Sequence, residues 1–520
     1  MKKTIYKLIL VMIVLFNTGC SEDFLERESL SSLANDNFWT TESDATLGLM
    51  GAYSALQSKW IYDSSPYEGG SVRWDFMSDN GYTTWQWMAG GDIAQGIHTA
   101  ESWMVNDTWK ALYVGITRAN TVIQKVGEMD ATNIDEATAK QIIAEASVIR
   151  ASLYNILAIL WKDVPLITEI QNVTEANVPK STREKTVAFI ISDLESVYED
   201  LPISNDWGRL TRGAALGTLA RINLFHAGYG GTYEKAAEYS QEVIDLGVYS
   251  LFPDYEDLFE IVNEQNNEVI WSIQFDRLQD NSSSIGGNWG ILDYQRVLPD
   301  LVQEYYMTDG LPYGESELSD SDDSSILSDN RDPRLSGAII THGDTFRNGN
   351  KSWDNQAYMR KWTNDELDWD QDAFHSSQDF YVIRYAHVLL MRAEALLMSG
   401  SYTESDVTGL VDQLRARVGM PLVAAVEGTG LSQEELLDIV KHERRIETPF
   451  EGLRYFDLMR WEELEEVYAK YMMEKQDIID LEYPNVGDRI FDPGKHYKWP
   501  IPQSEIDANS SLIQHTEWGG

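Results

Sequence analysis

The middle and the end of the chain carry apolar residues at the spacing of one face of an α-helix. Within residues 212–227, apolar side chains recur every three or four positions, at Leu216, Leu219, Ala220 and Leu224. A glycine-rich break follows, and residues 233–244 repeat the spacing. A period near 3.6 predicts amphipathic helices. We therefore predict a helical hairpin with small residues where its two helices cross.

Other segments show the same periodicity. Residues 383–398 followed by 407–418 predict a second hairpin, and further helices are predicted over 108–126, 137–161 and 184–198. Helix pairs that pack closely through alanine, with a large residue on each flank, form the unit of tetratricopeptide-like repeats. The predicted fold class is therefore mostly α: an α-helical body of tetratricopeptide-like hairpins with long irregular loop insertions.

Two stretches, residues 58–103 and 276–381, break the helical rhythm. Both mix tryptophan and tyrosine with Gly, Ser, Asp and Asn. Long irregular insertions in a helical body are usually functional or disordered, and their aromatic content argues against disorder. We predict that the two insertions belong to a single domain, residues 20–520, and carry its ligand site.

The first 19 residues have the composition of a lipoprotein signal peptide. Basic residues precede an apolar run over 8–16, and small Thr18 and Gly19 stand before Cys20. The run is shorter than the ~20 apolar residues needed to span a bilayer. Cys20 is the single cysteine of the sequence, so it has no partner for an internal disulfide and is free for lipidation. We predict a mature chain that begins at Cys20 and is anchored to a membrane without spanning it.

Charge narrows the range of partners. The formal net charge is −43, with 84 acidic residues against 41 basic ones. Such a surface repels phosphate backbones, which makes nucleic acid a poor candidate partner. The acidic run 315–323 offers oxygen atoms for weakly held calcium, but it lacks the EF-hand spacing and its central glycine. A solvated loop is the favoured interpretation, and no cofactor is predicted.

The common catalytic motifs are absent from the sequence. It contains no His-Glu-x-x-His run, no Gly-x-Ser-x-Gly elbow and no phosphate-binding glycine loop with lysine. Paired carboxylates for glycoside hydrolysis remain an alternative, because their separation is a spatial quantity that the sequence does not give. We predict a binding protein that is not an enzyme.

The binding chemistry favours sugars. A sugar ring has an apolar face that stacks on a flat aromatic side chain, each contact contributing on the order of 1 kcal/mol, and a rim of hydroxyls that needs polar partners. Trp85 and Trp87 lie among Thr, Gln and Gly, and Trp289 follows two glycines. Trp353 and Trp362 stand among charged and amide residues. The number of such aromatics favours a binding platform over single loop anchors.

Several motifs, in order along the chain, closely resemble those of the SusD/RagB family of outer-membrane, glycan-binding lipoproteins. The residues that carry the resemblance are Asp23-Phe24-Leu25-Glu26, Asn37-Phe38-Trp39, Gly51-Ala52-Tyr53, Trp161-Lys162-Asp163-Val164-Pro165-Leu166, Gly208-Arg209-Leu210-Thr211, Ile383-Arg384-Tyr385-Ala386, Glu443-Arg444-Arg445, Phe450-Glu451-Gly452, Arg460-Trp461 and Trp499-Pro500-Ile501-Pro502. The resemblance covers essentially the whole mature chain. It implies that the Glu443 to Trp461 motif is a structural charge network, and we interpret His387 as a packing residue.

The resemblance also implies a function. A family member sits over a SusC-like TonB-dependent transporter at the extracellular face of the outer membrane and presents a glycan to it. Ser21-Glu22-Asp23 resembles the acidic tag for that face. The implied ligand residues are Trp85 and Trp289 first, then Trp87, Tyr294, Trp353 and Trp362, with Arg73, Asp75 and Asn80 for hydroxyl contacts. The alternative is a peptide-uptake partner of a transporter.

Overall fold

The computed structural model describes most of the helical body and part of each insertion. The described residues are 38–63, 70–83, 90–172, 175–277, 282–283, 285, 295–319, 328–341, 344–346, 351–352, 357–363, 375–473 and 489–520. The longer helices are α2 (Glu42–Leu56), α5 (Trp103–Gly127), α6 (Glu136–Leu160), α7 (Arg183–Glu195), α8 (Arg212–Phe225), α9 (Tyr233–Asp245), α14 (Tyr385–Ser399), α15 (Glu404–Arg417), α17 (Gln433–Glu447), α18 (Arg454–Trp461) and α19 (Leu464–Met473). Short helices are α3 (Arg73–Phe76), α4 (Gly91–Ala94), α11 (Pro299–Glu304), α12 (Arg334–Ala338), α16 (Val423–Val426) and α21 (Gln503–Ala508).

Strands are few and short, and they pair two by two. They are β1 (Gly81–Thr83), β2 (Val164–Pro165), β3 (Lys180–Ser181), β4 (Val269–Ile273), β5 (Gln295–Val297), β6 (Ile339–Ile340), β7 (Thr345–Phe346), β8 (Lys351–Ser352), β9 (Tyr358–Met359) and β10 (Phe380–Arg384). The antiparallel pairs are β1 with β5, β2 with β3, β4 with β10, β6 with β9 and β7 with β8. The fold is therefore mostly α, as predicted.

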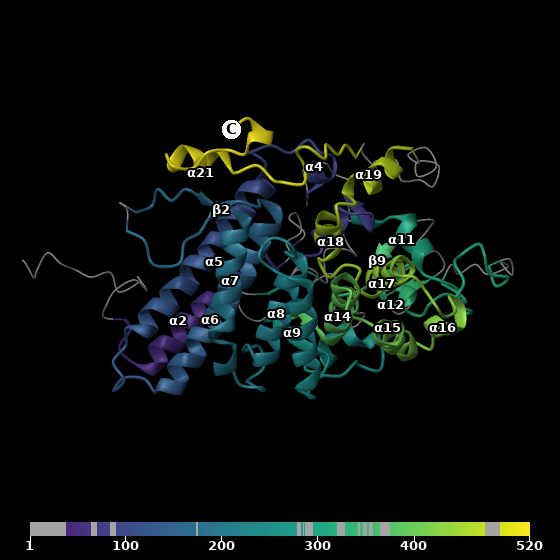
Figure 1. Ribbon diagram of the computed structural model, residues 1–520, viewed down its shortest axis with the longest axis horizontal. Helices are drawn as coiled ribbons and strands as arrows, with labels where there is room; N and C mark the ends of the chain where they lie inside the picture. The colour runs from purple at the N-terminus through teal and green to yellow at the C-terminus, as the bar shows by residue number, and fades with distance from the viewer. Residues whose placement is uncertain are drawn as a thin grey trace, which may run out of the picture.

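The long helices pack one against the next across the molecule (Figure 1). Helix α5 packs on α6, α6 on α7, α8 on α9, α9 on α14 and α14 on α15. The predicted hairpins are the pairs α8–α9 and α14–α15, and the second insertion leaves the chain between them. Several predicted boundaries differ from the structure: α5 begins at Trp103 and not at 108, and α7 ends at Glu195 and not at 198. Residue Ile383, expected in the helix, lies in strand β10, and α14 begins at Tyr385.

Threonine side chains fix where the hairpin helices begin. The hydroxyl of Thr211 accepts a hydrogen bond from the backbone N–H of Ala214, and that of Thr232 accepts one from Lys235. Each bond satisfies an N–H group that has no partner inside its own helix. Helix α8 is buried on nearly all sides, as expected of a helix at the centre of a helical body.

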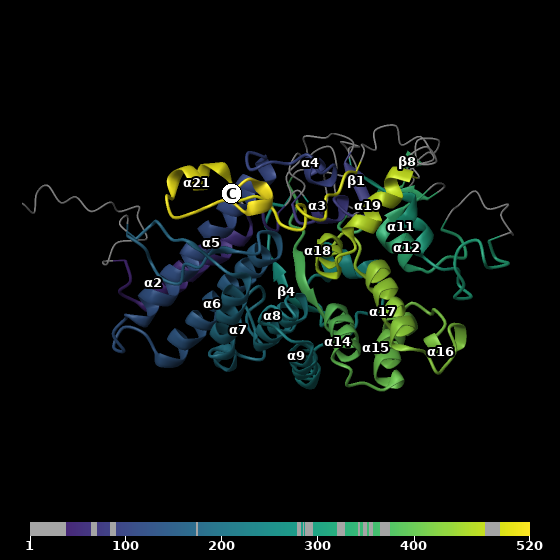
Figure 2. The ribbon, with the colours of Figure 1, turned by 45° about the horizontal axis from the view of Figure 1, so that its top comes forward.

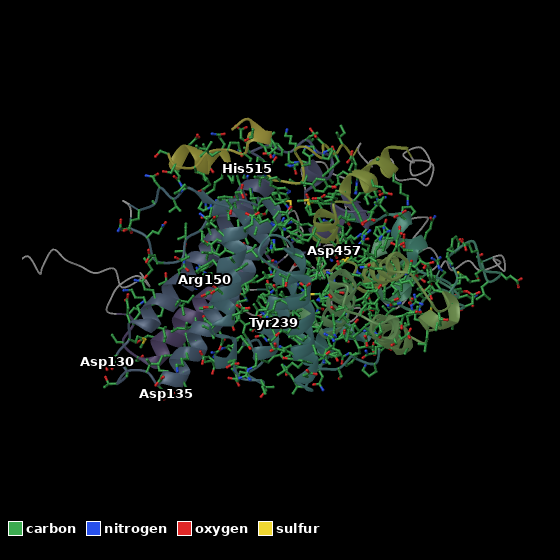
Figure 3. All side chains as sticks on the ribbon, in the orientation of Figure 1. Asp130, Asp135, Arg150, Tyr239, Asp457 and His515 are labelled. Carbon is green, nitrogen blue, oxygen red and sulfur yellow. The ribbon has the colours of Figure 1, made fainter. Side chains whose placement is uncertain are left out.

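Helix α6 lies at the centre of the helices at the N-terminal end. It is the one helix in the described part of the chain that is long and apolar enough to cross a membrane, and most of it is buried in the protein. Arg150 projects from α6, and its Nη2 contacts Asp193 Oδ1 of α7 at 2.7 Å (Figure 3). Burial and this ion pair indicate a core helix.

The C-terminal segment closes the fold over the ends of α5 and α6. In Figure 2 it runs with α21 along the top of the molecule. Trp161 Nε1 donates to the carbonyl of Pro500 at 2.8 Å, and the backbone N–H of Trp499 donates to Leu160 at 2.8 Å. The Trp161 and Trp499 rings meet edge to face with centroids 5.2 Å apart. Residues more than 300 positions apart therefore share one aromatic core.

A buried charge network connects strand β10 to helices α12, α15 and α17. We call it the core charge network, and its members are Arg334, Lys361, Arg384, Arg415, Arg417, Glu268, Glu443, Glu447 and Glu451. The neighbouring pair Arg444–Asp457, with Asp457 labelled in Figure 3, joins α17 to α18 at 2.7 Å. His387 is buried, with Nε2 2.7 Å from Glu451 Oε2. The structural interpretation of the Glu443 to Trp461 motif is confirmed.

Candidate functional site

Part of the first aromatic stretch, residues 58–103, is anchored inside the protein. Asp75 of α3 accepts hydrogen bonds from the backbone N–H groups of Phe450 (3.0 Å) and Gly452 (2.9 Å) and from Asn80 Nδ2 (2.8 Å). Burial raises the pKa of Asp75 to about 7. The Asn80 side-chain oxygen in turn accepts from Arg445 Nε at 3.1 Å.

Three predicted ligand contacts are corrected by this arrangement. Arg73, Asp75 and Asn80 are all buried, and protein groups bond most of their polar atoms, which argues against contacts with a ligand hydroxyl. Arg73 Nη2 donates to the carbonyl of Trp60 at 2.6 Å. These residues hold the segment in place, which is a positioning role.

The prediction that Trp362 contacts the ligand is also wrong. Its side chain is fully buried, and Nε1 donates to the carbonyl of Phe450 at 2.8 Å. Its ring meets Phe259 edge to face at 4.9 Å. A tryptophan enclosed on both faces cannot stack on a sugar. Its backbone lies in the left-handed region, with a φ of +69°.

Described parts of the two aromatic stretches meet at the β1–β5 ladder. Strand β1 pairs antiparallel with β5, and Thr83 is the direct partner of Gln295. Trp85 follows Thr83 by two positions, and Tyr294 directly precedes Gln295. The other predicted ligand aromatics Trp87, Trp289 and Trp353, like Trp85, Tyr294 and the predicted lipidation site Cys20, lie outside the described residues.

Thr83 and Gln295 present polar atoms that no group in the described chain satisfies. Thr83 Oγ1 and both Gln295 side-chain polar atoms, Oε1 and Nε2, are buried and without a hydrogen-bond partner. A buried polar atom left unpaired costs about 1–3 kcal/mol, so such atoms usually have a purpose. Sequence reasoning missed both residues, although their position directly beside the aromatics was an available signal.

A third segment joins the same ladder. The backbone N–H of Val297 in β5 donates to the carbonyl of Ala357 at 3.0 Å, just before β9. Ala357, four positions after Trp353 in the sequence, therefore lies beside β5 at Val297. Val297 is the partner of Gly81, at the end of the ladder opposite Thr83 and Gln295.

Comparison with known proteins identifies the family. A sequence profile described as the SusD family matches residues 267–518, and one described as starch-binding associating with outer membrane matches residues 23–224. The chain belongs to the SusD/RagB family.

Relatives of this SusD/RagB chain match it over nearly its whole length. SusD-like protein P25 of Formosa agariphila is 26% identical over 98% of each chain, and a SusD-like protein of Bacteroides ovatus is 27% identical over 87% of this chain and 82% of its own. A crystal structure of a SusD-like carbohydrate binding protein from Bacteroides fragilis superposes with a TM-score of 0.78 at 25% identity, covering 92% of this chain and all of its own. A laminarin binding SusD-like protein, 24% identical, shares the fold with a TM-score of 0.70 over 92% of this chain and 99% of its own.

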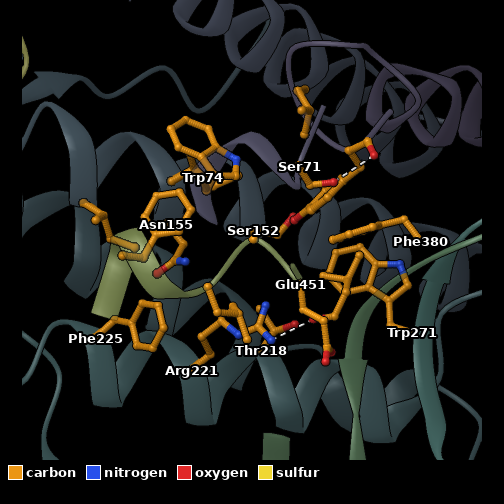
Figure 4. Close-up of a pocket in the computed structure, with 18 of the residues that line it drawn as sticks. Ser71, Trp74, Ser152, Asn155, Thr218, Arg221, Phe225, Trp271, Phe380 and Glu451 are labelled. Carbon is orange, nitrogen blue, oxygen red and sulfur yellow. Dashed lines mark hydrogen bonds between the residues drawn. The ribbon is translucent and has the colours of Figure 1, made fainter. Parts of the chain in front are cut away.

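The SusD/RagB body encloses a small cavity that is distinct from the ladder end. The cavity is about 50 Å³ and lies between α6, α8, β4 and the 451–456 segment. Figure 4 shows Trp74, Trp271 and Phe380 on its walls and Arg221 beside it. Ligand pockets are typically about 300–1,000 Å³, whereas this volume suits one or two water molecules. It is not a site for a sugar.

One pair of buried acidic residues bears on the glycosidase alternative. Glu264 Oε1 accepts from the backbone N–H of Asp379 at 2.6 Å and from Gln378 Nε2 at 2.9 Å. Asp379 Oδ1 accepts from the backbone N–H of Phe275 at 3.1 Å. Both carboxyls are buried and bonded to protein groups, which is typical of a structural pair.

Glu264→Gln is expected to flatten the pH dependence of stability. Burial, followed by the charge of Asp379, raises the pKa of Glu264 to about 9 from an ordinary 4.5. Between those values the folded protein keeps a proton that the unfolded chain releases, so wild-type stability falls as the pH rises. Glutamine does not titrate. Urea denaturation should therefore show the variant gaining stability relative to wild type between pH 5 and pH 8.

The matched control for this variant is Glu101→Gln, at an exposed position. It should leave the difference between pH 5 and pH 8 unchanged. A Glu264→Gln protein whose stability follows the wild-type curve through that range would show that Glu264 is already ionised in the folded state.

Among the residues with described placement, no group of three or more His, Cys, Asp or Glu side chains is arranged to hold a metal ion. The part of the acidic run 315–323 from residue 320 onward lies outside those residues.

Proposed function

We propose that this protein binds an oligo- or polysaccharide at the end of the β1–β5 ladder and passes it to a SusC-like TonB-dependent transporter. The observation that carries the proposal is the direct pairing of Thr83 with Gln295. It joins two aromatic-rich stretches that lie about 200 positions apart in the sequence. Each stretch by itself offers single rings, and together they can form a platform.

Chain connectivity limits how far the aromatics can be from this point. Consecutive Cα atoms are about 3.8 Å apart. The Cα of Trp85 is therefore within about 8 Å of that of Thr83, and the Cα of Tyr294 is next to that of Gln295. Strand partners are about 5 Å apart. Rings from both stretches can thus reach one sugar chain.

The polar atoms at the ladder end complement the aromatics chemically. A sugar hydroxyl both donates and accepts, so it matches the chemistry of the Gln295 carbonyl oxygen, the Gln295 amide and the Thr83 hydroxyl, which are buried and which a ligand reaches only when the chain around them opens. Stacking rings beside buried hydrogen-bonding groups are the usual composition of a carbohydrate site. The carbohydrate- and laminarin-binding SusD-like proteins of the same fold support this assignment.

The family supports a cellular setting for this proposal. The matching profile described as associating with the outer membrane supports an outer-membrane location. We place the lipid anchor on Cys20 and the binding face outside the cell, where the ladder end meets glycan before the transporter does. The protein then acts by binding and release, with no chemical step of its own.

The double variant Trp85→Ala with Trp289→Ala is expected to weaken glycan binding about 100-fold. Each lost stacking contact is worth on the order of 1–1.5 kcal/mol, close to a factor of ten. Retardation gels across plant, fungal and host polysaccharides would first identify the ligand. Isothermal titration with its oligosaccharides would then measure the loss, and Gln295→Ala should weaken binding separately.

The matched control is Trp103→Ala. Trp103 is 64% exposed at the start of α5, close to the C-terminal segment, and lies outside the ladder end. Its variant should bind as wild type does. Unchanged affinity in the double variant, or no glycan bound across the whole panel, would contradict the proposal. Mass spectrometry of the ligand that copurifies with the transporter complex would reveal a peptide instead.

A further inference from the structure

A second pocket, separate from the ladder end, opens where several helices finish. Its volume is about 350 Å³, and it is lined by the ends of α6, α8 and α18, the start of α7 and the segment 493–498. None of its lining residues belongs to β1, β5 or β9. A pocket of this size accommodates a small molecule.

Two cationic side chains face this pocket without a carboxylate partner in the described chain. Lys162, just after α6, takes part in no ion pair or hydrogen bond there. Arg183 uses Nε to contact His226 Nδ1 at 2.9 Å and Nη2 to contact the carbonyl of Phe225 at 3.1 Å, both neutral groups. The protein has a net charge of −43, so cations without an ion-pair partner in a pocket are a local exception to its overall charge.

The acidic residues on the pocket wall compensate these cations only in part. Asp163 Oδ1 accepts from the backbone N–H of Arg183 at 3.0 Å. Glu517 pairs with another lysine of the wall, Lys498, at 3.2 Å. Glu184 and Glu462 oppose the cationic charge from a distance, and both are exposed to solvent, which screens them. At Lys162 the effect of burial exceeds the opposing charge of Glu462.

The local titration behaviour agrees with this geometry. Burial, then the charge of Arg183, holds the pKa of Lys162 well below its ordinary value. Burial, then Arg183 and Lys162, lowers the pKa of His226. An anion next to Lys162 would offset both effects, because an opposite charge favours the protonated form.

The backbone conformation at Lys162 also supports a role for its side chain in this pocket. Lys162 ends α6 with a φ of +63°, a left-handed conformation that costs a non-glycine residue about 1–2 kcal/mol. Glycine would end the helix without that cost. What lysine adds at this position is a cationic side chain at the pocket wall.

Part of the remaining wall is aromatic. Tyr229, Tyr233, Tyr497 and Trp461 line the pocket, and the Arg183 guanidinium stacks on the Tyr229 ring at 4.0 Å. Tyr229 is 42% exposed, so one side of it is open to a ligand. Aromatic faces beside cations suit a ring-shaped polar molecule that carries a negative group.

We propose that this pocket binds an acidic sugar through its oxyanion, a carboxylate or a sulfate, held by Lys162 and Arg183 beside the Tyr229 ring. This site is independent of the ladder end. It gives an acidic protein a local place for negatively charged ligands that its overall field would repel.

Titration of the purified protein with D-glucuronate, glucose 6-sulfate and neutral glucose at low salt tests the proposal. We expect calorimetric binding and a raised thermal midpoint with one or both acidic sugars and neither effect with glucose. The two acidic sugars distinguish a carboxylate site from a sulfate site. Equal responses to glucose and to both acidic sugars, or no response to any of them, would overturn the proposal.

The variant Lys162→Met should lower the affinity for the acidic sugar by about tenfold or more, because a charge-assisted bond contributes about 1.5–3 kcal/mol. It should also raise the thermal midpoint without ligand, since it removes an uncompensated cation. Lys140→Met, at an exposed lysine of α6, is the matched control. Unchanged affinity for the acidic sugar in Lys162→Met would contradict the proposal. Retained acidic-sugar binding in the Trp85→Ala, Trp289→Ala protein would separate this site from the ladder end.

Discussion

Arg384→Met should lower the free energy of unfolding by about 3–5 kcal/mol, the typical cost of removing one partner from a buried ion pair. Arg384 is fully buried. Its guanidinium contacts Glu268 Oε1 and Glu447 Oε1 at 2.7 Å, and Glu451 Oε1 at 2.7 Å. Methionine fills similar space but leaves three buried carboxylates without their shared cation. Urea denaturation at pH 7 would measure the loss.

The pH dependence of this loss tests its electrostatic origin. Arg417 and Arg384 hold the pKa of Glu447 well below its usual range, and Arg384 does the same for Glu451. Groups with a lowered folded pKa contribute stability above the unfolded value near 4.5, and that contribution is lost as the pH falls. Without Arg384 the carboxylates protonate more readily. The deficit of Arg384→Met should therefore be larger at pH 7 than at pH 4.

Two further variants separate charge from geometry. Arg384→Lys keeps the charge but loses the fork that reaches three carboxylates at once, so an intermediate loss is expected. Arg118→Met removes an arginine from an exposed position and should change stability by less than about 1 kcal/mol. A loss below about 1 kcal/mol for Arg384→Met, equal at both pH values, would show that the core charge network does not hold the helices together.

The helical body was predictable because its signals are local. The apolar spacing of 212–227 and the glycines after it identify the α8–α9 hairpin, and the threonines that cap both helices stand within the sequence pattern itself. The error at Ile383 has a physical cause. Its apolar neighbours continue the helical period, but pairing with Trp271 of β4 extends the backbone there. Strand pairing depends on a segment more than 100 positions away.

The errors at the candidate site have the same origin. Trp362 stands among charged and amide neighbours in the sequence, which is typical of exposed residues, yet its burial is decided by the Phe450 turn nearly 90 positions later. Arg73 and Asp75 flank Trp74 as a surface pair would, but their partners come from Lys59, Trp60, Phe450 and Gly452. The composition of a segment gives its polarity. It does not give the distant residues that pack on that segment in the fold and bury it.

Substitution of the buried Asp75 directly tests how the first aromatic stretch is anchored to the helical body. Asp75→Ala should lower the free energy of unfolding by about 2–5 kcal/mol, because three N–H groups lose their acceptor and each buried unpaired donor costs about 1–3 kcal/mol. Two of those donors, at Phe450 (φ +61°) and Gly452 (φ +72°), belong to a turn in left-handed conformation. Chemical denaturation at pH 6 would measure the loss.

Asp75→Asn is the matched control, since its amide oxygen still accepts at one position. Its loss should be smaller than that of Asp75→Ala, and it should shrink further as the pH rises. Burial raises the pKa of Asp75 to about 7, so wild-type stability declines from about pH 4 to pH 7 while asparagine does not titrate. A loss in Asp75→Asn that grows with pH would contradict this account of the carboxyl.

The same two variants test whether the anchoring of residues 75–83 affects glycan binding. Residues 75–83 run from the Asp75 contacts directly to Thr83 at the ladder end. Loosening that connection costs affinity, because the ligand must then also order the segment that carries its partners. Asp75→Ala should therefore bind glycan more weakly than Asp75→Asn at a temperature where both are folded. Equal affinities would show that the pairing of β1 with β5 alone positions the ladder end, and that Asp75 acts on stability without acting on binding.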